Sequence, residues 1–151
     1  MTAETLASLD FSSAKSTLSE LMTQVVHGHA PRIVSRHRGK EEMVLVATDD
    51  LARFLESFRF DPRLTIDGDE VTAELAELGL LGFGETLEAA MEDLVEELRI
   101  YAGDFFERAS FYAETDRADH APWLLRFALT PPDKQLELLY EDSRQAAAPA
   151  S

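Results

Sequence analysis

The 151-residue chain contains no cysteine, which excludes disulfide bonds, thiolate nucleophiles and cysteine-ligated zinc or iron–sulfur sites. Any catalysis would depend on carboxylates, hydroxyls and four histidines. The sequence also lacks a run of eighteen uncharged apolar residues, and residues 1–10 have neither the basic start nor the apolar run of a signal peptide. These absences predict a cytoplasmic protein, and the 45% of hydrophobic residues predict that the chain folds.

Positive charge is scarce, since 14 Lys and Arg stand against 29 Asp and Glu and give a net charge of −15. Such a balance argues against a chain that binds nucleic acid over its whole surface, because that affinity comes from neutralising phosphates. The charge is unevenly distributed, however: residues 1–60 carry a net −1 and residues 61–151 a net −14. Residues 11–40 alone carry +4. We therefore expect the two halves to meet different partners.

The first sixty residues have an α-β-β-α pattern. Apolar residues spaced three and four apart predict a helix that Ser12 or Ser13 caps and Gly28 ends. Two extended segments around an Arg-Gly-Lys turn predict a hairpin, and a capped short helix follows before the Asp61-Pro62 break. The expected elements are a helix over 12–28, strands over 32–37 and 43–47, a helix within 48–60 and, as an option, a strand over 6–11.

These residues resemble the N-terminal module of Phd/YefM-type antitoxins (prevent-host-death family) over about residues 6–58. The resemblance is carried in order and spacing by Ser12-Ser13-Ala14-Lys15 with Leu18, by His29 to Arg36, by the turn at Gly39, by Met43–Ala47 and by Asp49-Asp50-Leu51. It implies a homodimer that grips operator DNA and represses its own transcription, together with a C-terminal segment that neutralises a toxin encoded beside it.

The resemblance also implies which residues contact DNA. Lys15 matches the family's basic residue at the start of the helix, and Arg36 matches the one that ends the first hairpin strand. We assign His37, Arg38 and Lys40 to the DNA contact from their position in the adjoining turn. A dimer carries two copies of the +4 segment, and its two-fold symmetry matches a palindromic operator. The alternative is that these five residues are ordinary solvated surface side chains.

The second half predicts a small sheet followed by helices. Tight turns separate three short apolar runs, and Thr86 caps a long helix with an apolar seam at alternating four- and three-residue spacing. The expected elements are strands over 63–66, 71–76 and 80–83, a long helix after Thr86 that Gly103 interrupts, a helix from Pro122, and a last helix that Asp133 caps.

Around residues 70–98 the chain resembles the sheet-to-helix passage of HicB-type antitoxins, which implies a folded partner-binding unit. The expected fold class is thus α+β: a Phd/YefM-like α-β-β-α dimerisation module, then a small β-sheet, a long helix and C-terminal helices. We expect residues 1–60 to bind DNA and dimerise, residues 61–142 to form an acidic toxin-binding region, and residues 143–151 to be a flexible tail.

The acidic region predicts a basic partner, and the antitoxin resemblance implies a RelE-like RNA-cleaving toxin. Charge should steer the association, and aromatic side chains should anchor it. The candidate anchors are Tyr101, Phe105, Phe106, Phe111, Tyr112 and Trp123. Their alternative role is in the core of this half, which is the better interpretation for Phe105.

Other motifs carry weaker functional interpretations. The glycines within residues 79–86 lack the Lys-Ser/Thr ending of a phosphate loop and suit a turn and a helix entry. His27 and His29 lack a third metal ligand at close spacing, and residues 67–70 suit a β-turn better than a calcium loop. We expect no catalytic residue, metal or cofactor. The alternatives are a small acidic or metal-dependent hydrolase that uses His120 with Asp116 and Asp119, and an adaptor that binds only protein.

Overall fold

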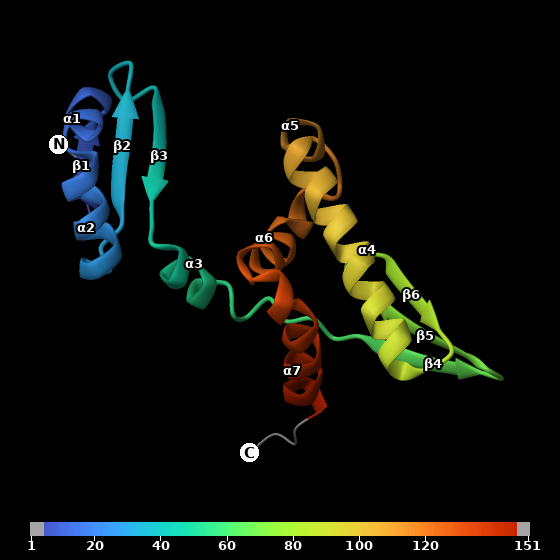
Figure 1. Ribbon diagram of the computed structural model, residues 1–151. Coiled ribbons are helices and arrows are strands. Elements are labelled where there is room, and N and C mark those ends of the chain that lie inside the picture. The colour runs from blue at the N-terminus through green and yellow to red at the C-terminus, as the bar shows by residue number, and fades with distance from the viewer. Residues whose placement is uncertain (1–4, 148–151) are drawn as a thin grey trace. The chain divides into compact units, whose positions relative to one another are not determined.

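The computed structural model describes residues 5–147, and the chain forms two compact units, Met1–Phe54 and Leu55–Ser151 (Figure 1). Each unit has a three-stranded sheet and a hydrophobic core of its own. The fold is α+β, which confirms the predicted class. Within residues 5–147, no helix combines the length and apolar composition needed to cross a membrane.

The first unit contains a mixed sheet and three helices (Figure 1). The sheet has the order β1-β2-β3, in which β1 runs parallel to β2 and β3 antiparallel to it. The predicted hairpin and the optional first strand are therefore both present. The elements are β1 (Ser8–Asp10), α1 (Phe11–Ser16), α2 (Leu18–Gly28), β2 (Arg32–Arg36), β3 (Glu41–Leu45) and α3 (Thr48–Phe54).

The expected helix over residues 12–28 is two helices that meet at Thr17. The Thr17 hydroxyl donates to the Ser13 carbonyl at 2.7 Å, and the Ser16 hydroxyl donates to the same oxygen at 3.1 Å. Hydroxyls that compete for backbone carbonyls disfavour a continuous helix, and Thr17 leaves helical geometry with φ −120° and ψ 24°. The predicted cap was also wrong, because the Asp10 carboxylate accepts from the Ser13 amide at 2.7 Å and caps α1.

The core of the first unit is small. Its fully buried apolar side chains are Ala14, Leu21, Val25 and Val34, and Leu9 and Leu45 pack against them. A core of this size buries little apolar surface for a domain of about fifty residues. Burial of further apolar surface against another protein surface would therefore stabilise this unit.

The second unit begins with a meander of three antiparallel strands, and a long helix packs on it (Figure 1). Thr86 caps this helix as predicted, with its hydroxyl accepting from the Ala89 amide at 3.1 Å. The elements are β4 (Arg63–Asp67), β5 (Glu70–Leu75), β6 (Leu80–Gly84), α4 (Leu87–Glu107), α5 (Ala109–Tyr112), α6 (Ala121–Leu129) and α7 (Gln135–Ala147), with 3₁₀ turns at Ala118–His120 and Pro132–Lys134.

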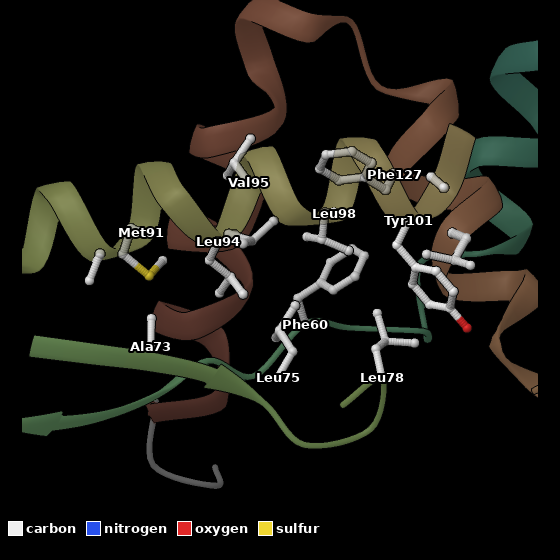
Figure 2. Packing of buried hydrophobic residues seen from close by; sticks show 14 of the residues in the cluster. Phe60, Ala73, Leu75, Leu78, Met91, Leu94, Val95, Leu98, Tyr101 and Phe127 are labelled. Atoms are coloured by element: carbon white, nitrogen blue, oxygen red, sulfur yellow. The ribbon is translucent and has the colours of Figure 1, made fainter. Parts of the chain in front are cut away.

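The predicted seam of α4 forms the centre of the larger core. Leu94 and Leu98 are fully buried, and Figure 2 shows them facing Ala73, Leu75 and neighbouring side chains of the meander. Side chains from α6 and α7 complete the cluster. The a/d spacing thus identified the buried face of α4, except at its first position, where Leu87 is exposed.

Two glycines allow α4 to approach β6 closely. A Cβ atom at Gly82 would lie 2.5 Å from the Leu94 nitrogen and closer still to the Ala90 carbonyl oxygen. One at Gly84 would lie 2.6 Å from the Ala89 Cβ atom. The turn glycine is Gly79, with φ +67°. Gly79 thus serves the predicted turn, whereas Gly82 and Gly84 allow the close helix–sheet contact, a role that the sequence did not indicate.

The segment before β4 packs with the second unit. The Phe60 side chain is 1% exposed in the larger core, and its amide donates to the Asp142 carboxylate at 2.8 Å. Arg126 donates to the Phe58 carbonyl at 3.3 Å and to Asp142 Oδ1 at 3.1 Å. Residues 55–60 thus belong to the second compact unit, whereas our expected functional division lies after residue 60.

The C-terminal helix also extends further than expected. Helix α7 continues to Ala147 and so includes the first residues of the segment that we expected to be a flexible tail. Residues 148–151 of that segment lie outside the described part of the chain.

Candidate nucleic-acid and partner interfaces

The exposed cations of the hairpin gather at its tip, which we name the basic turn (Arg36–Lys40). His37, Arg38 and Gly39 all have positive φ, at 53°, 58° and 81°. The Lys40 amide closes the turn by donating to the His37 carbonyl at 3.2 Å. Positive φ is uncommon for residues other than glycine, and sparsely populated backbone conformations cluster at functional sites. The hairpin brings together four of the five predicted DNA contacts.

Arg36 is paired with an acid of the same hairpin. Its Nε and Nη2 atoms donate to Glu41 Oε2 at 3.0 and 2.8 Å, and His37 Nε2 lies 3.5 Å from Glu41 Oε1. Both side chains of the Arg36–Glu41 pair are 53% exposed. Ion pairs this exposed contribute little to stability, so a phosphate can replace Glu41 as the partner of Arg36.

A shallow hollow connects the basic turn with the start of α1. It is lined by Asp10, Phe11, Ser12, Ser35, Arg36, His37, Arg38 and Gly39. The hydrogen bond from the Ser13 amide lowers the pKa of Asp10, which keeps a negative charge at the helix start. Lys15 lies in the last turn of the short α1 rather than in its first turn, and it does not line this hollow. Three of the five predicted DNA contacts, Arg36, His37 and Arg38, line the hollow, whereas Lys15 and Lys40 do not.

A buried acid that we did not predict as a site residue joins α3 to the end of α2. The Asp50 side chain is 4% exposed, and it contacts His29 Nδ1 at 3.0 Å and Arg53 Nη2 at 2.6 Å. Burial alone would raise the pKa of Asp50, but the hydrogen bonds from Arg53 and His29 outweigh it and lower the pKa. The only sequence signal was the Asp49-Asp50-Leu51 motif, which does not show that His29 lies beside Asp50.

Helix α2 presents apolar side chains on the face away from the core. Leu18, Met22 and Val26 are 50%, 58% and 44% exposed, and they recur every four residues. We name these three residues the apolar stripe. Residues spaced by four lie on one face of a helix, so the stripe is a continuous uncovered surface of the first unit.

The six predicted aromatic anchors divide into buried and exposed residues. Tyr101, Phe105 and Tyr112 are buried in the larger core, where the Tyr101 hydroxyl lies 2.6 Å from His120 Nδ1. Tyr112 donates to the Asp104 carboxylate at 2.5 Å, and this bond raises the pKa of the tyrosine. A partner cannot contact these three rings without opening the core.

The remaining anchors lie closer to the surface. Phe106 and Phe111 are 39% and 55% exposed, and the Arg108 guanidinium lies 4.6 Å from the Phe111 ring centre. Trp123 is half-buried, packs edge-on against Phe58 and donates to the Arg59 carbonyl at 3.2 Å. Among the six predicted anchors, Phe106 and Phe111 are therefore the exposed ones.

The residues of the hydrolase alternative do not form a recognisable catalytic arrangement. Desolvation lowers the pKa of His120, and its Nδ1 atom is engaged by Tyr101. Asp116 and Asp119 influence this pKa by charge, but neither is hydrogen-bonded to the imidazole among the described contacts. Over residues 5–147, no group of three or more His, Asp and Glu side chains is arranged to hold a metal ion.

Comparison with known proteins gives one family and one closely similar fold. Residues 5–140 match the family model described as PHD_like, "Antitoxin of toxin-antitoxin, RelE / RelB, TA system". The crystal structure of an antitoxin of a proposed toxin–antitoxin system from Syntrophomonas wolfei subsp. wolfei is 17% identical. The similarity covers 88% of this chain and 96% of that chain, with a TM-score of 0.78, and it shows a shared fold. The comparison with curated proteins gave no match.

The family match spans both compact units, including the stretch that resembles HicB-type antitoxins. The second half of the chain is therefore part of the family's pattern as well. An antitoxin family is not enzymatic, so the family match does not support the hydrolase alternative. The chain belongs to the PHD_like family of antitoxins of RelE/RelB toxin–antitoxin systems.

Proposed function

We propose that this antitoxin binds operator DNA as a homodimer through its first unit and neutralises its cognate toxin through its acidic second unit. The observation that carries this proposal is the separation of two surfaces on two compact units. The exposed cations of the basic turn lie on the first unit, and the net −14 of residues 61–151 lies on the second. Cations attract the phosphates of DNA, and an acidic unit is electrostatically complementary to a toxin that presents a basic RNA-binding surface.

The apolar stripe supports the homodimer. A second copy that packs its own stripe against Leu18, Met22 and Val26 removes three large apolar side chains per chain from water. It also supplements the small core of the first unit and presents two basic turns. Two-fold symmetry of the protein then matches a palindromic operator.

Met22→Glu is expected to dissociate the dimer and to weaken operator binding at least tenfold, because it places two like charges in the apolar contact. Sedimentation measures the oligomeric state, and fluorescence anisotropy with operator DNA measures the affinity. The matched control is Gln24→Glu, which adds the same charge to an exposed position of α2 outside the stripe. Unchanged dimerisation of Met22→Glu would move the interface away from the stripe.

Arg36→Ala is expected to weaken operator binding by about 1–3 kcal/mol and to make the affinity less steeply dependent on salt. The physical reason is the loss of a cation from the basic turn of both subunits. Arg144→Ala is the control, because Arg144 is 66% exposed and pairs only with Glu141 on the surface of α7 among the described contacts. If both variants lose the same affinity, overall charge rather than the basic turn governs the binding.

On the toxin-binding side, exposure supports Phe106 and Phe111 as the anchors among the six predicted residues. Phe106 and Phe111 are exposed near the junction of α4 and α5, and aromatic side chains contribute strongly to interface energy. The net negative charge of the second unit accelerates association with a basic toxin, and the two rings slow its dissociation. Tyr101, Phe105 and Tyr112 then act indirectly, by holding this surface in place.

A further inference from the structure

The two edges of the second sheet differ. The sheet has the order β4-β5-β6, so β4 and β6 are its outer strands (Figure 1). At the β6 edge, the Phe83 amide donates to the Asp93 carboxylate of α4 at 2.8 Å. Helix α4 packs against β6 and β5, and among the described residues no strand lies beside the free edge of β4. Strand β4 is thus an uncovered edge, which proteins usually protect.

Strand β4 also carries apolar side chains on the inner face of the sheet, the face on which α4 packs over β5 and β6. All five of its residues are exposed, and Leu64 and Ile66 are 48% and 75% exposed. Their register partners on β5, Ala73 and Val71, are buried beneath α4. The helix therefore covers the inner face of β5 and leaves that of β4 open, although both belong to one sheet.

The register of the hairpin shows which backbone groups of β4 face outward. Asp67 pairs with Glu70 across a two-residue turn. Residues that flank such a turn exchange hydrogen bonds, and the pattern alternates along the ladder. Residues 63, 65 and 67 therefore direct their amides and carbonyls to β5. Leu64 and Ile66 direct theirs to the free edge.

We propose that β4 is a second self-association site, at which the β4 strands of two copies pair antiparallel about a two-fold axis through Thr65. In this register Leu64 and Ile66 exchange backbone hydrogen bonds with Ile66 and Leu64 of the second copy. Their side chains meet on the inner face. Arg63 lies opposite Asp67 of the second copy, twice over, and opposite charges directly across a ladder are stabilising. The segment Arg-Leu-Thr-Ile-Asp is therefore complementary to itself.

The flanking residues confine the pairing to these five positions. Pro62 lacks an amide hydrogen and cannot extend the ladder. Gly68 and Asp69 form the turn that leads into β5, so at the other end the ladder stops at Asp67. This contact is distinct from the apolar stripe of the first unit, so the inference goes beyond the proposed function. If β4 pairs with β4 of a chain in another operator-bound dimer, the contact joins the two dimers into a larger assembly on adjacent operator sites.

The absence of cysteine permits a direct test by disulfide cross-linking of the full chain. Thr65→Cys places two sulfurs across the axis, where the Cα atoms of a non-hydrogen-bonded pair lie about 4.5 Å apart, within the range of a disulfide. We expect most of this variant to form a disulfide-linked dimer under mild oxidation. The control is Asp69→Cys, also exposed, which lies in the turn beyond β4. The two copies of Asp67 are already four residues apart along the ladder, roughly 14 Å at about 3.4 Å per residue, so cysteines in the turns beyond them are out of reach of a disulfide. The charge that Asp69→Cys removes would, if anything, assist association.

A charge reversal tests the register. In the Thr65→Cys chain, Arg63→Asp should reduce the rate of cross-linking at least fivefold, and the double change Arg63→Asp with Asp67→Arg should restore it. Circular dichroism of each variant checks the fold. Equal cross-linking at residues 65 and 69, or none at residue 65, would overturn the proposal. If the co-expressed protein of the neighbouring reading frame shields the thiol introduced at position 65 from alkylation, while the free chain does not cross-link, β4 is instead a toxin contact.

Discussion

Replacing Asp142 by alanine is expected to destabilise the second unit by about 3–5 kcal/mol, the usual cost of removing one partner of a buried ion pair. Asp142 is 2% exposed, and its carboxylate accepts from Arg126 and from the Phe60 amide. The variant leaves the Arg126 side chain, which is 11% exposed, without its counter-charge. It also leaves the buried Phe60 amide without an acceptor. Denaturant unfolding of the full chain, followed by the fluorescence of Trp123, measures the loss.

The neighbouring acid of the same helix provides the control. Glu141 is 54% exposed and pairs with Arg144 at the surface, so Glu141→Ala should change the stability by no more than about 1 kcal/mol. Asp142→Asn is informative as well, because it preserves size but weakens the charge-assisted bond to Arg126. If Asp142→Ala and Glu141→Ala had similar effects, the segment 58–60 would not be held by this network.

The sequence predicted elements that local signals determine. The hairpin of the first unit and the β4–β5 hairpin of the second each have a glycine with positive φ at the turn, and extended segments with apolar β-forming residues on either side. The cap at Thr86 and the seam through Leu94 and Leu98 identified α4 and its buried face for the same reason. In each of these elements, the turn or cap residue and the pattern of apolar residues independently predict the same structure.

The prediction of one helix over residues 12–28 failed because periodicity does not include side-chain competition for the backbone. The apolar spacing continues through Thr17, but hydroxyls at residues 16 and 17 bond to the Ser13 carbonyl. The consequence for the candidate site is direct. Lys15 lies in the last turn of a short helix instead of the first turn of a long one, and it is not among the residues that line the hollow beside the basic turn.

Polar contacts between residues far apart in the chain could not be predicted from the sequence. His29 and Asp50 are 21 residues apart, and Phe60 and Asp142 are 82 apart. No local pattern specifies which acid in a chain with 29 of them will be buried. The sequence also did not show which aromatic side chains are buried. Phe105 and Phe106 are adjacent, yet Phe105 is 4% exposed and Phe106 is 39% exposed. Only the packing of α4 against its neighbours separates a core ring from a candidate partner contact.

Deletion of the second unit is expected to preserve operator binding and to abolish toxin neutralisation. The chain should be ended at residue 54, because residues 55–60 pack with the second unit and Phe60 would otherwise expose its ring. The shortened chain keeps the basic turn and the apolar stripe but loses the acidic unit to which we assign toxin binding. Anisotropy with operator DNA measures the first property, and growth during expression of the neighbouring toxin-like reading frame measures the second.

A subtler variant separates loss of the surface from loss of the unit. Phe106→Ala with Phe111→Ala removes two exposed rings while leaving Tyr101, Phe105 and Tyr112 to hold the core, so the full chain should fold and bind operator but rescue growth poorly. Arg36→Ala should show the opposite behaviour, with intact rescue and weakened operator binding. Immunoblotting verifies equal protein levels, since a degraded antitoxin would also fail to rescue. Growth rescued by the chain that ends at residue 54 would place toxin neutralisation in the first unit and contradict this division of labour.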